Sequence, residues 1–229
     1  MMSSKDKKGF TLIELLVVML ITLIVMTGIY STYMTQQKAY IVQEQISEMQ
    51  QNLRVSMYQI ERDFRMAGFS SEIIDGDIDG IMTAASSEFE FDRRIIGGDD
   101  DGDEQTIKYF INATSSLGED TLSRTSTNIT DGKGPGTEPI AQNIEVVDLT
   151  YIYDDGSEAI PSATDFDPGK ICSVQVTLVA KVAKEDLDYK CVDSFTDMQG
   201  DEVLAPPDDH YRRRSLSKHI KFRNLCMGQ

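Results

Sequence analysis

Histidine, cysteine and tryptophan are scarce in this sequence, and their scarcity excludes several kinds of catalytic site. The chain of 229 residues has two histidines, three cysteines and no tryptophan. Both histidines, His210 and His219, lie near the C-terminus, so a histidine-based zinc site or hydrolytic triad has too few residues to build on. The sequence also lacks the GxGxxG and GxxxxGK[ST] patterns of phosphate-binding loops. These absences argue against an enzyme.

Basic residues are also fewer than acidic ones. Lysine and arginine total 22 against 38 aspartates and glutamates, which gives a formal net charge of −16. Such a chain repels nucleic-acid phosphates unless a basic patch is set apart from the acidic body. The length and the 40% hydrophobic content suit one domain with a real core, or one domain and an extended segment. A binding, structural or assembly protein is the class that remains.

The N-terminus departs from this acidic, polar average. Three lysines (Lys5, Lys7 and Lys8) precede residues 10–30, an apolar run whose single charge is Glu14. As a helix rising about 1.5 Å per residue, the run is about 31 Å long and can cross a bilayer. The basic leader should stay in the cytoplasm, with the rest of the chain on the far side. No small-residue cleavage site follows the run, so we predict a retained membrane helix.

Glu14 is anomalous within this apolar run. A carboxylate costs roughly 2.5–3.5 kcal/mol at mid-membrane and less near the end of the span. Cleavage between Gly9 and Phe10 would place a positive α-amine one helical turn away, as a partner within the chain or between chains. The alternative is a glutamate that extends to the lipid headgroups.

The string KKGFTLIELLVV, Lys7 to Val18, closely resembles the prepilin signal of type IV pilins and type II secretion pseudopilins. In that family a membrane-embedded prepilin peptidase cuts after the glycine and methylates the new N-terminal residue. The resemblance implies a leader at residues 1–9, cleavage between Gly9 and Phe10, and methylation of Phe10. It also implies that Glu14 acts in subunit recruitment and register within the filament.

The helical pattern continues over residues 31–67 with an amphipathic face. Its apolar stripe predicts either a coiled-coil seam or, as we favour, the surface on which a globular head packs. Gly68 is the expected end of this helix, and Gly28 is a weak point in it that costs about 1 kcal/mol relative to alanine. The stripe consists of Ile46, Met49, Leu53, Met57, Ile60 and Phe64.

Residues 68–229 read as a β-rich head. Segments of alternating polarity, separated by clusters of glycine, aspartate and proline, predict an antiparallel sheet with long loops, and hence an α+β fold. Irregular stretches are expected at Thr125–Pro139 and Lys184–Asp209. The strand candidates are Glu88–Asp92, Thr106–Phe110, Ile144–Tyr153, Ile171–Val182 and Leu216–Leu225.

Blocks near both ends extend the resemblance to the PilW-type minor pilins. They are QQKAY (Gln36–Tyr40), MQQNLR (Met49–Arg54), IERDFRMAGF (Ile60–Phe69) and YRRRSLSKHIKFRNL (Tyr211–Leu225). This family has the type IV pilin fold, a long N-terminal helix packed on an antiparallel β-sheet head. The resemblance implies a non-enzymatic minor pilin that helps to initiate a type IV pilus and can sit at its tip. The alternative is a J-type pseudopilin of type II secretion.

The same resemblance implies partners and a location. The partners would be other minor and major pilins, the prepilin peptidase, the inner-membrane assembly platform and the lipid of the inner membrane. The protein would be a single-pass protein of the bacterial inner membrane with its head in the periplasm. It would then enter the filament or its tip.

Asp75, Asp77 and Asp79, followed by Gly80, match the opening of an EF-hand loop. The glutamate expected at the twelfth position is replaced by Ser86, so Glu88 or water would complete a calcium shell. The alternative is a solvated acidic turn. The acidic cluster at residues 99–103 lacks the spacing and reads as a hairpin turn.

After Asp209 the chain carries basic residues and no acidic ones. We expect a strand whose basic side chains neutralise acidic neighbours, in this head or in the next subunit. A DNA-contacting patch is the weaker alternative, because only Tyr211 and Phe222 are available to stack on bases. The basic residues are Arg212, Arg213, Arg214, Lys218, Lys221 and Arg223.

The head would be exported to an oxidising compartment, where a disulfide can form. Antiparallel pairing of the last two strand candidates would place Cys172 opposite Cys226, with Cys191 in the connecting segment. We therefore predict a Cys172–Cys226 bond, and the alternative is a bond that includes Cys191.

Overall fold

The computed structural model divides the chain into two compact units, Met1–Glu44 and Gln45–Gln229, each of which is described by itself. The predicted leader, residues 1–9, lies outside the described residues. The structure describes residues 10–68, 81–84, 88–94, 104–112, 120–128, 134, 136–159 and 170–223.

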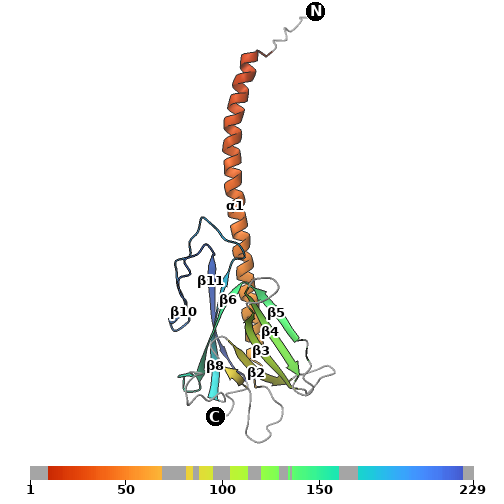
Figure 1. The fold of residues 1–229 in the computed structure, drawn as a ribbon, viewed down its shortest axis with the longest axis vertical. Coiled ribbons are helices and arrows are strands. Elements are labelled where there is room, and N and C mark those ends of the chain that lie inside the picture. The colour runs from red at the N-terminus through yellow and green to blue at the C-terminus, as the bar shows by residue number, and fades with distance from the viewer. Residues whose placement is uncertain are drawn as a thin grey trace, which may run out of the picture. The chain divides into compact units, whose positions relative to one another are not determined.

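One helix, α1, runs from Leu12 to Phe64 (Figure 1). It starts two residues later and ends three residues earlier than the sequence pattern predicted. One turn follows, and Gly68, the expected end, has a φ of 68° and donates its N–H to the carbonyl of Asp92 at 3.0 Å. The helix is continuous through Gly28, so the predicted weak point does not break it.

The first unit consists of the apolar part of this helix. All of its side chains from Phe10 to Ile41 are exposed, and the most apolar window has a mean hydropathy of 2.7. By length and composition, α1 is the one helix in the described part of the chain that is able to cross a membrane. Threonine hydroxyls along the helix donate hydrogen bonds to the carbonyl four residues earlier, as Thr22 does to Val18. These bonds satisfy polar groups that lipid cannot.

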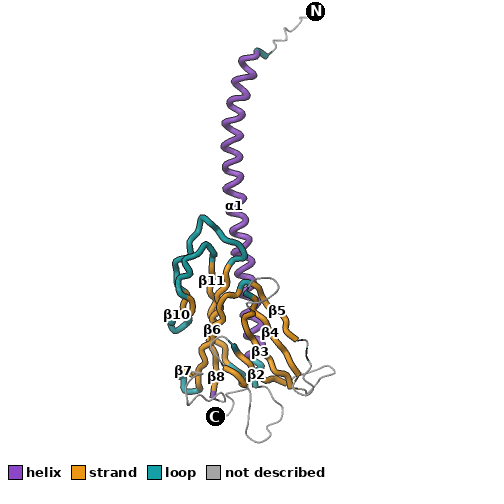
Figure 2. The backbone as a smooth tube through the Cα atoms, viewed as in Figure 1, coloured by secondary structure: helices purple, strands orange, loops and turns teal. Residues whose placement is uncertain are grey.

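The described residues of the second unit form three antiparallel sheets, where the sequence predicted one. Figure 2 shows their strands in orange. The largest has five strands in chain order, so each strand pairs with the next one. Its strands are β1 (Ile81–Ala84), β2 (Phe89–Arg94), β3 (Glu104–Asn112), β4 (Thr121–Asn128) and β5 (Gly136–Gln142).

The second sheet has four strands in the order β11-β8-β6-β7, and a small hairpin forms the third. The four strands are β6 (Ile144–Tyr153), β7 (Glu158–Ala159), β8 (Ile171–Lys181) and β11 (Arg213–Lys221). The hairpin joins β9 (Phe195–Thr196) to β10 (Glu202–Leu204). The chain passes from the first sheet to the second at Asn143, a buried residue with a φ of 61°.

The prediction of irregular structure over Thr125–Pro139 was wrong at both ends, because β4 ends and β5 begins within it. Residues 129–133 and 135 lie outside the described residues. The sequence of β4, TLSRTSTN, is rich in serine and threonine, and its strand character lies in small polar side chains. Four of its first five positions are nonetheless buried against neighbouring elements. Hydrophobic alternation is therefore a poor guide to this strand.

The core lies between the C-terminal part of α1 and the two larger sheets. Five of the six residues of the predicted apolar stripe are buried in it and Ile46 packs against it partly buried, which confirms that this helix face is the base of the head. Phe64 is central: its ring centroid lies 4.2 Å from that of Phe89, 5.9 Å from Tyr109 and 6.2 Å from Phe222. These rings come from both sheet regions, so one residue at the helix end joins them. Burial of such aromatic side chains dominates core stability.

Candidate functional site

Glu14, the predicted assembly residue, lies in the first turn of α1, beside Thr11. Thr11 precedes the first helical residue, and its hydroxyl accepts the backbone N–H of Glu14 at 3.3 Å. Thr11 and Glu14 thus stand at the two positions of a capping box. The carboxylate of Glu14 also lies in the first turn, where the helix dipole favours negative charge.

The cap adds a second reason for a glutamate at this position. The sequence had suggested a buried charge in need of a partner, and it had not pointed to Thr11. The signal was present in the T-x-x-E spacing at residues 11–14. Phe10 is described and exposed, whereas Gly9 lies outside the described residues, so cleavage and methylation at this junction stay predictions.

A second concentration of charge lies inside the head, at Asp63. Its side chain is only 1% exposed and accepts from Arg93 Nη1 at 2.9 Å and from Arg124 Nε at 2.7 Å. The hydroxyl of Tyr109 donates to the same carboxylate at 2.7 Å, and the amide of Gln59 donates at 3.3 Å. One helical carboxylate is therefore bound to strands β2, β3 and β4.

Tyr109 acts here as a hydrogen-bond donor to Asp63. Burial, together with the nearby charge of Asp63, raises the pKa of the Tyr109 hydroxyl far above its ordinary value. The network thus gives Asp63 two cationic partners and one hydroxyl that donates a hydrogen bond. Donors of this kind offset the loss of hydration that burial of a carboxylate entails.

Sequence reasoning missed the role of Asp63. The residue was visible as an acid on the buried face of the helix, three positions after Ile60 in the apolar stripe. A charge at such a position needs a partner across the interface. The identity of the partners, two arginines from separate strands, depends on the register of the first sheet.

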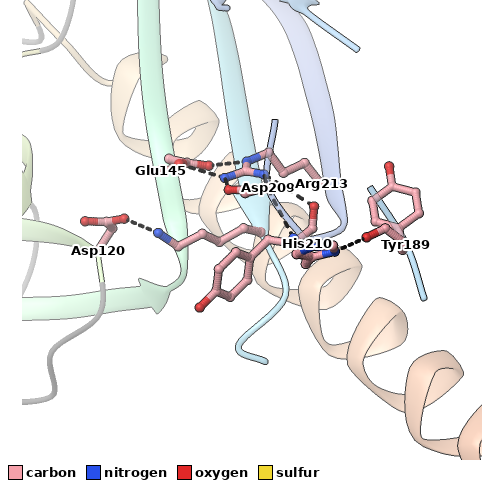
Figure 3. A network of polar contacts seen from close by, with 8 residues as sticks. Asp120, Glu145, Tyr189, Asp209, His210 and Arg213 are labelled. Carbon is pink, nitrogen blue, oxygen red and sulfur yellow. Dashed lines mark hydrogen bonds and ion pairs between the residues drawn. The ribbon is translucent and has the colours of Figure 1, made fainter. Parts of the chain in front are cut away.

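The basic tail forms ion pairs with acidic residues of the head, as expected for a neutralising strand. Arg213 is 2% exposed and lies between two carboxylates, Glu145 of β6 and Asp209 (Figure 3). Its guanidinium nitrogens lie 2.6 and 3.1 Å from Glu145 oxygens and 2.6 and 2.7 Å from Asp209 oxygens. Hydrogen bonds from Arg213 lower the pKa of the Asp209 carboxyl below its usual value.

Two more tail residues are paired within the head. Arg212 lies 2.8 Å from Asp186 and stacks on the ring of Tyr189 at 4.2 Å. Lys218 of β11 reaches Glu61 of α1 at 2.6 Å. These pairs tie the segment before β11 and the strand itself to acidic neighbours, and they leave less free positive charge for nucleic acid.

Most of the predicted calcium ligands lie outside the described residues. Asp75, Asp77 and Asp79 fall there, and only Glu88 is described. Glu88 lies 2.6 Å from Lys108, and both side chains are 36% exposed. Among the described residues, no three histidine, cysteine, aspartate or glutamate side chains gather as a metal site would require.

The structure shows which of the described cysteines forms a disulfide and which does not. Cys191 is a buried free thiol, and Cys172 is disulfide-bonded. The reasoning from register was wrong, because Phe222 is the residue opposite Cys172 and donates its N–H to that carbonyl at 3.0 Å. Cys226 lies outside the described residues, so its bond to Cys172 stays a prediction.

Comparison with known families agrees with this architecture. Residues 4–30 match the prokaryotic N-terminal methylation motif, and residues 108–224 match the type IV pilus-assembly protein W family. The second match spans half of the chain. The chain belongs to the type IV pilus-assembly protein W family. The matched region of this family begins within β3 and includes β11.

A solved structure supports the pilin fold. A type IV-like pilin from Thermus thermophilus superposes with a TM-score of 0.53 at 13% sequence identity, covering 77% of this chain and 97% of that chain. At that identity the likeness concerns the fold alone. No curated protein matches the sequence. The chain thus has a type IV pilin fold and belongs to a structural family, not to an enzyme family.

Proposed function

We propose that this protein is a minor pilin that takes part in the initiation of a type IV pilus, together with other minor pilins at the filament tip. The observation that carries the proposal is membership of the assembly protein W family in a chain whose apolar helix begins with a prepilin motif. Family membership implies contact with other pilins and with the assembly machinery in general. The apolar helix and the motif are consistent with anchoring in a membrane.

The sequence of events follows from the N-terminal residues. The prepilin peptidase removes residues 1–9 and methylates Phe10, while the helix stays in the inner membrane with the head in the periplasm. The assembly platform then moves the subunit out of the lipid into a helical bundle. Glu14, at the capped helix end, pairs with an N-terminal amine during this step.

If the protein is a low-abundance initiator at the filament tip, its deletion should have a specific phenotype. Deletion of the gene should reduce the number of surface pili without abolishing the cellular pool of the major pilin. Counting pili by electron microscopy, beside an immunoblot of total major pilin, tests this expectation. A strain complemented with the wild-type gene on a plasmid is the control.

The same deletion strain distinguishes the pilus role from a J-type pseudopilin role in secretion. Secreted exoproteins are assayed in the culture supernatant of the strain in which the pili were counted. Normal secretion with reduced piliation supports the proposal. Lost secretion with normal piliation overturns it in favour of the pseudopilin.

A further inference from the structure

Strand β11 is an outer strand of the four-stranded sheet and pairs on one side only. Its antiparallel register with β8 runs from Arg213 opposite Lys181 to Lys221 opposite Ser173. On its other side no strand of the described part of the chain pairs with it. A nine-residue run of backbone at the edge of a sheet is therefore open to a further strand.

The hydrogen-bond pattern shows which backbone groups of β11 point outward. Val182 donates to the carbonyl of Arg212, and Phe222 donates to the carbonyl of Cys172, just beyond the two ends of the pairing. Bonded and non-bonded pairs alternate in an antiparallel ladder. The odd-numbered residues between these ends therefore direct their N–H and C=O groups away from β8: Arg213, Ser215, Ser217, His219 and Lys221.

The other sheet edges described here are poorer templates. β1 has four residues and β7 has two, while β5 carries Pro139, which has no N–H to donate. β11 has nine residues and no proline or glycine. Edges that natural proteins protect from pairing are usually short or interrupted in these ways. Length and continuity distinguish β11 from them.

The charged side chains along β11 determine which charge a partner strand should carry. Arg214, Lys218, His219 and Lys221 are all exposed on β11, in a chain whose net charge is −16, and among the four Lys218 is already paired with Glu61 of α1. Two copies of the strand placed edge to edge would bring like charges together, which is destabilising. An acidic strand would instead gain attraction along its length. The lysines and arginine therefore discourage self-pairing and favour an acidic partner.

The side-chain faces of β11 define the pattern that such a partner needs. Every second residue of β11 lies on the face toward the core, and three of these are Arg214, Leu216 and Lys218. Leu216 is partly buried there and packs against the core cluster. A neighbouring strand would place one apolar residue beside Leu216, one acidic residue beside Arg214, and a second acidic residue that shares Lys218 with Glu61. The complementary pattern is acidic–x–apolar–x–acidic, where x faces away from the core.

We propose that the edge of β11 receives an extended acidic segment from another pilus subunit, which adds a fifth strand to this sheet. The proposal deepens the proposed function, on which it rests, because it names the surface and the chemistry by which the head binds a partner subunit. Strand addition obtains its affinity from backbone hydrogen bonds and its specificity from alternate side chains.

The test uses the full-length protein in detergent micelles and a synthetic nine-residue peptide with two aspartates flanking a valine at alternate positions. Two further peptides serve as probes: one with lysines in place of the aspartates, and one with the acidic sequence but methylated backbone nitrogens. We expect the acidic peptide to bind at least fivefold more tightly than either, by fluorescence anisotropy. Equal binding of the methylated peptide overturns the proposal, because a side-chain charge contact alone would explain it.

Amide hydrogen exchange, read by NMR, locates the contact. The acidic peptide should slow exchange at Ser215, Ser217 and His219, whose N–H groups point outward, and leave Arg214 and Lys218 unchanged. Failure of the outward amides to gain protection also overturns the proposal. This readout leaves the protein unaltered, so it holds whether or not a variant folds.

A pair of substitutions at one exposed position provides the matched control. Ser215→Pro removes an outward N–H without removing a bond to β8, whereas Ser215→Ala keeps it. We expect at least a fivefold loss of peptide affinity in the proline variant and less than a twofold change in the alanine variant. Equal affinity in both contradicts the proposal. Peptide binding does not depend on piliation, so failure of the pilus role in the deletion strain would be recognised separately.

Discussion

The carboxylate of Asp63 and the guanidinium of Arg124 meet at 2.7 Å inside the head, with the aspartate 1% and the arginine 9% exposed. The two residues are far apart in the sequence, on α1 and on β4. Their ion pair, together with Arg93 and Tyr109, attaches the last turn of the helix to the middle of the first sheet. The junction of helix and head thus combines a polar network with the aromatic packing around Phe64.

The first prediction concerns loss of this carboxylate. Asp63→Ala should destabilise the head by about 3–5 kcal/mol, because two arginines and a tyrosine hydroxyl lose their buried acceptor. The midpoint of urea unfolding in detergent, followed by circular dichroism in the β region, measures the change. Arg65→Ala is the control, since the Arg65 side chain is 58% exposed and an i, i+4 pair such as the one it makes with Glu61 is worth about 0.5 kcal/mol. Equal losses in the two variants would show that the Asp63 network adds nothing.

The second prediction uses the pH dependence of Asp148 on β6. Burial, followed by the negative charges of Asp197, Asp201 and Glu158, raises the pKa of the Asp148 carboxyl. A carboxyl whose pKa is raised by folding contributes stability at low pH and loses it as the pH rises through the raised value. Asp148→Asn should therefore be more stable than the parent at pH 7, by about 0.5 kcal/mol after screening.

The stability difference between Asp148→Asn and the parent should vanish near pH 3, where the carboxyl is protonated in both folded and unfolded chains. Urea midpoints at pH 3 and pH 7 measure it. Asp154→Asn, at an exposed turn, is the control and should show no such change. A stabilisation by Asp148→Asn that persists unchanged at pH 3 would refute the electrostatic explanation.

Much of this fold was predictable because its strongest signals are periodic. The amphipathic stripe that ends at Phe64 and the strands β6 and β8 appear as clear periods in the sequence, and the apolar run at residues 10–30 is recognised by its length alone. β4 and β5 did not, because the buried positions of β4 hold Ser123, Arg124 and Ser126. Their burial follows from pairing with neighbours that are distant in the sequence, which a local pattern cannot report.

The candidate site was predictable to a similar degree. Phe10 and Glu14 are local features of a continuous sequence motif, so they were found without the fold. Asp63 depends on Arg93 and Arg124, which the register of three strands brings to one carboxylate. The predicted strand register that placed Cys226 opposite Cys172 was wrong for the same reason. Strand boundaries that are wrong by a few residues change every cross-strand neighbour.

The third prediction separates the cysteines. A Cys172–Cys226 bond would close a loop of roughly 55 residues and contribute about 4 kcal/mol in the chain-entropy model. Cys172→Ser should cost about this much in unfolding free energy, and Cys191→Ala about 1 kcal/mol or less. Peptide mapping under non-reducing conditions identifies the bonded pair directly. A bridged Cys191 peptide would contradict the assignment.

The fourth prediction tests calcium binding by the acidic segment at residues 75–80. Isothermal titration of the full-length protein with calcium should give a saturable heat that Asp77→Asn reduces at least tenfold in affinity. Asp101→Asn, in the second acidic cluster, is the control and should leave the titration unchanged. A solvated acidic turn would instead give no saturable heat, or heat that is unaffected by Asp77→Asn.

The last prediction separates two roles of Glu14, as a helix cap and as a charge. Glu14→Gln keeps a side chain that can complete the capping box with Thr11 but removes the carboxylate. Thr11→Ala removes the hydroxyl of the cap, at a cost of about 1 kcal/mol, and keeps the charge. Because an N-terminal amine needs a counter-charge in a low-dielectric bundle, Glu14→Gln should be cleaved normally and still fail to enter filaments. Thr11→Ala should be cleaved and assembled, with at most a modest loss.

Gel mobility reports removal of the leader, and immunoblots of sheared pili report filament entry. Gly9→Val is the processing control, since it should leave a longer precursor in the membrane. If Glu14→Gln assembled as well as the parent while Thr11→Ala did not, the cap would be the function of this position. Glu14 would then stabilise the start of α1, and its charge would face the headgroups without a partner. Failure of both variants would mean that the carboxylate needs the cap to hold it in position for pairing.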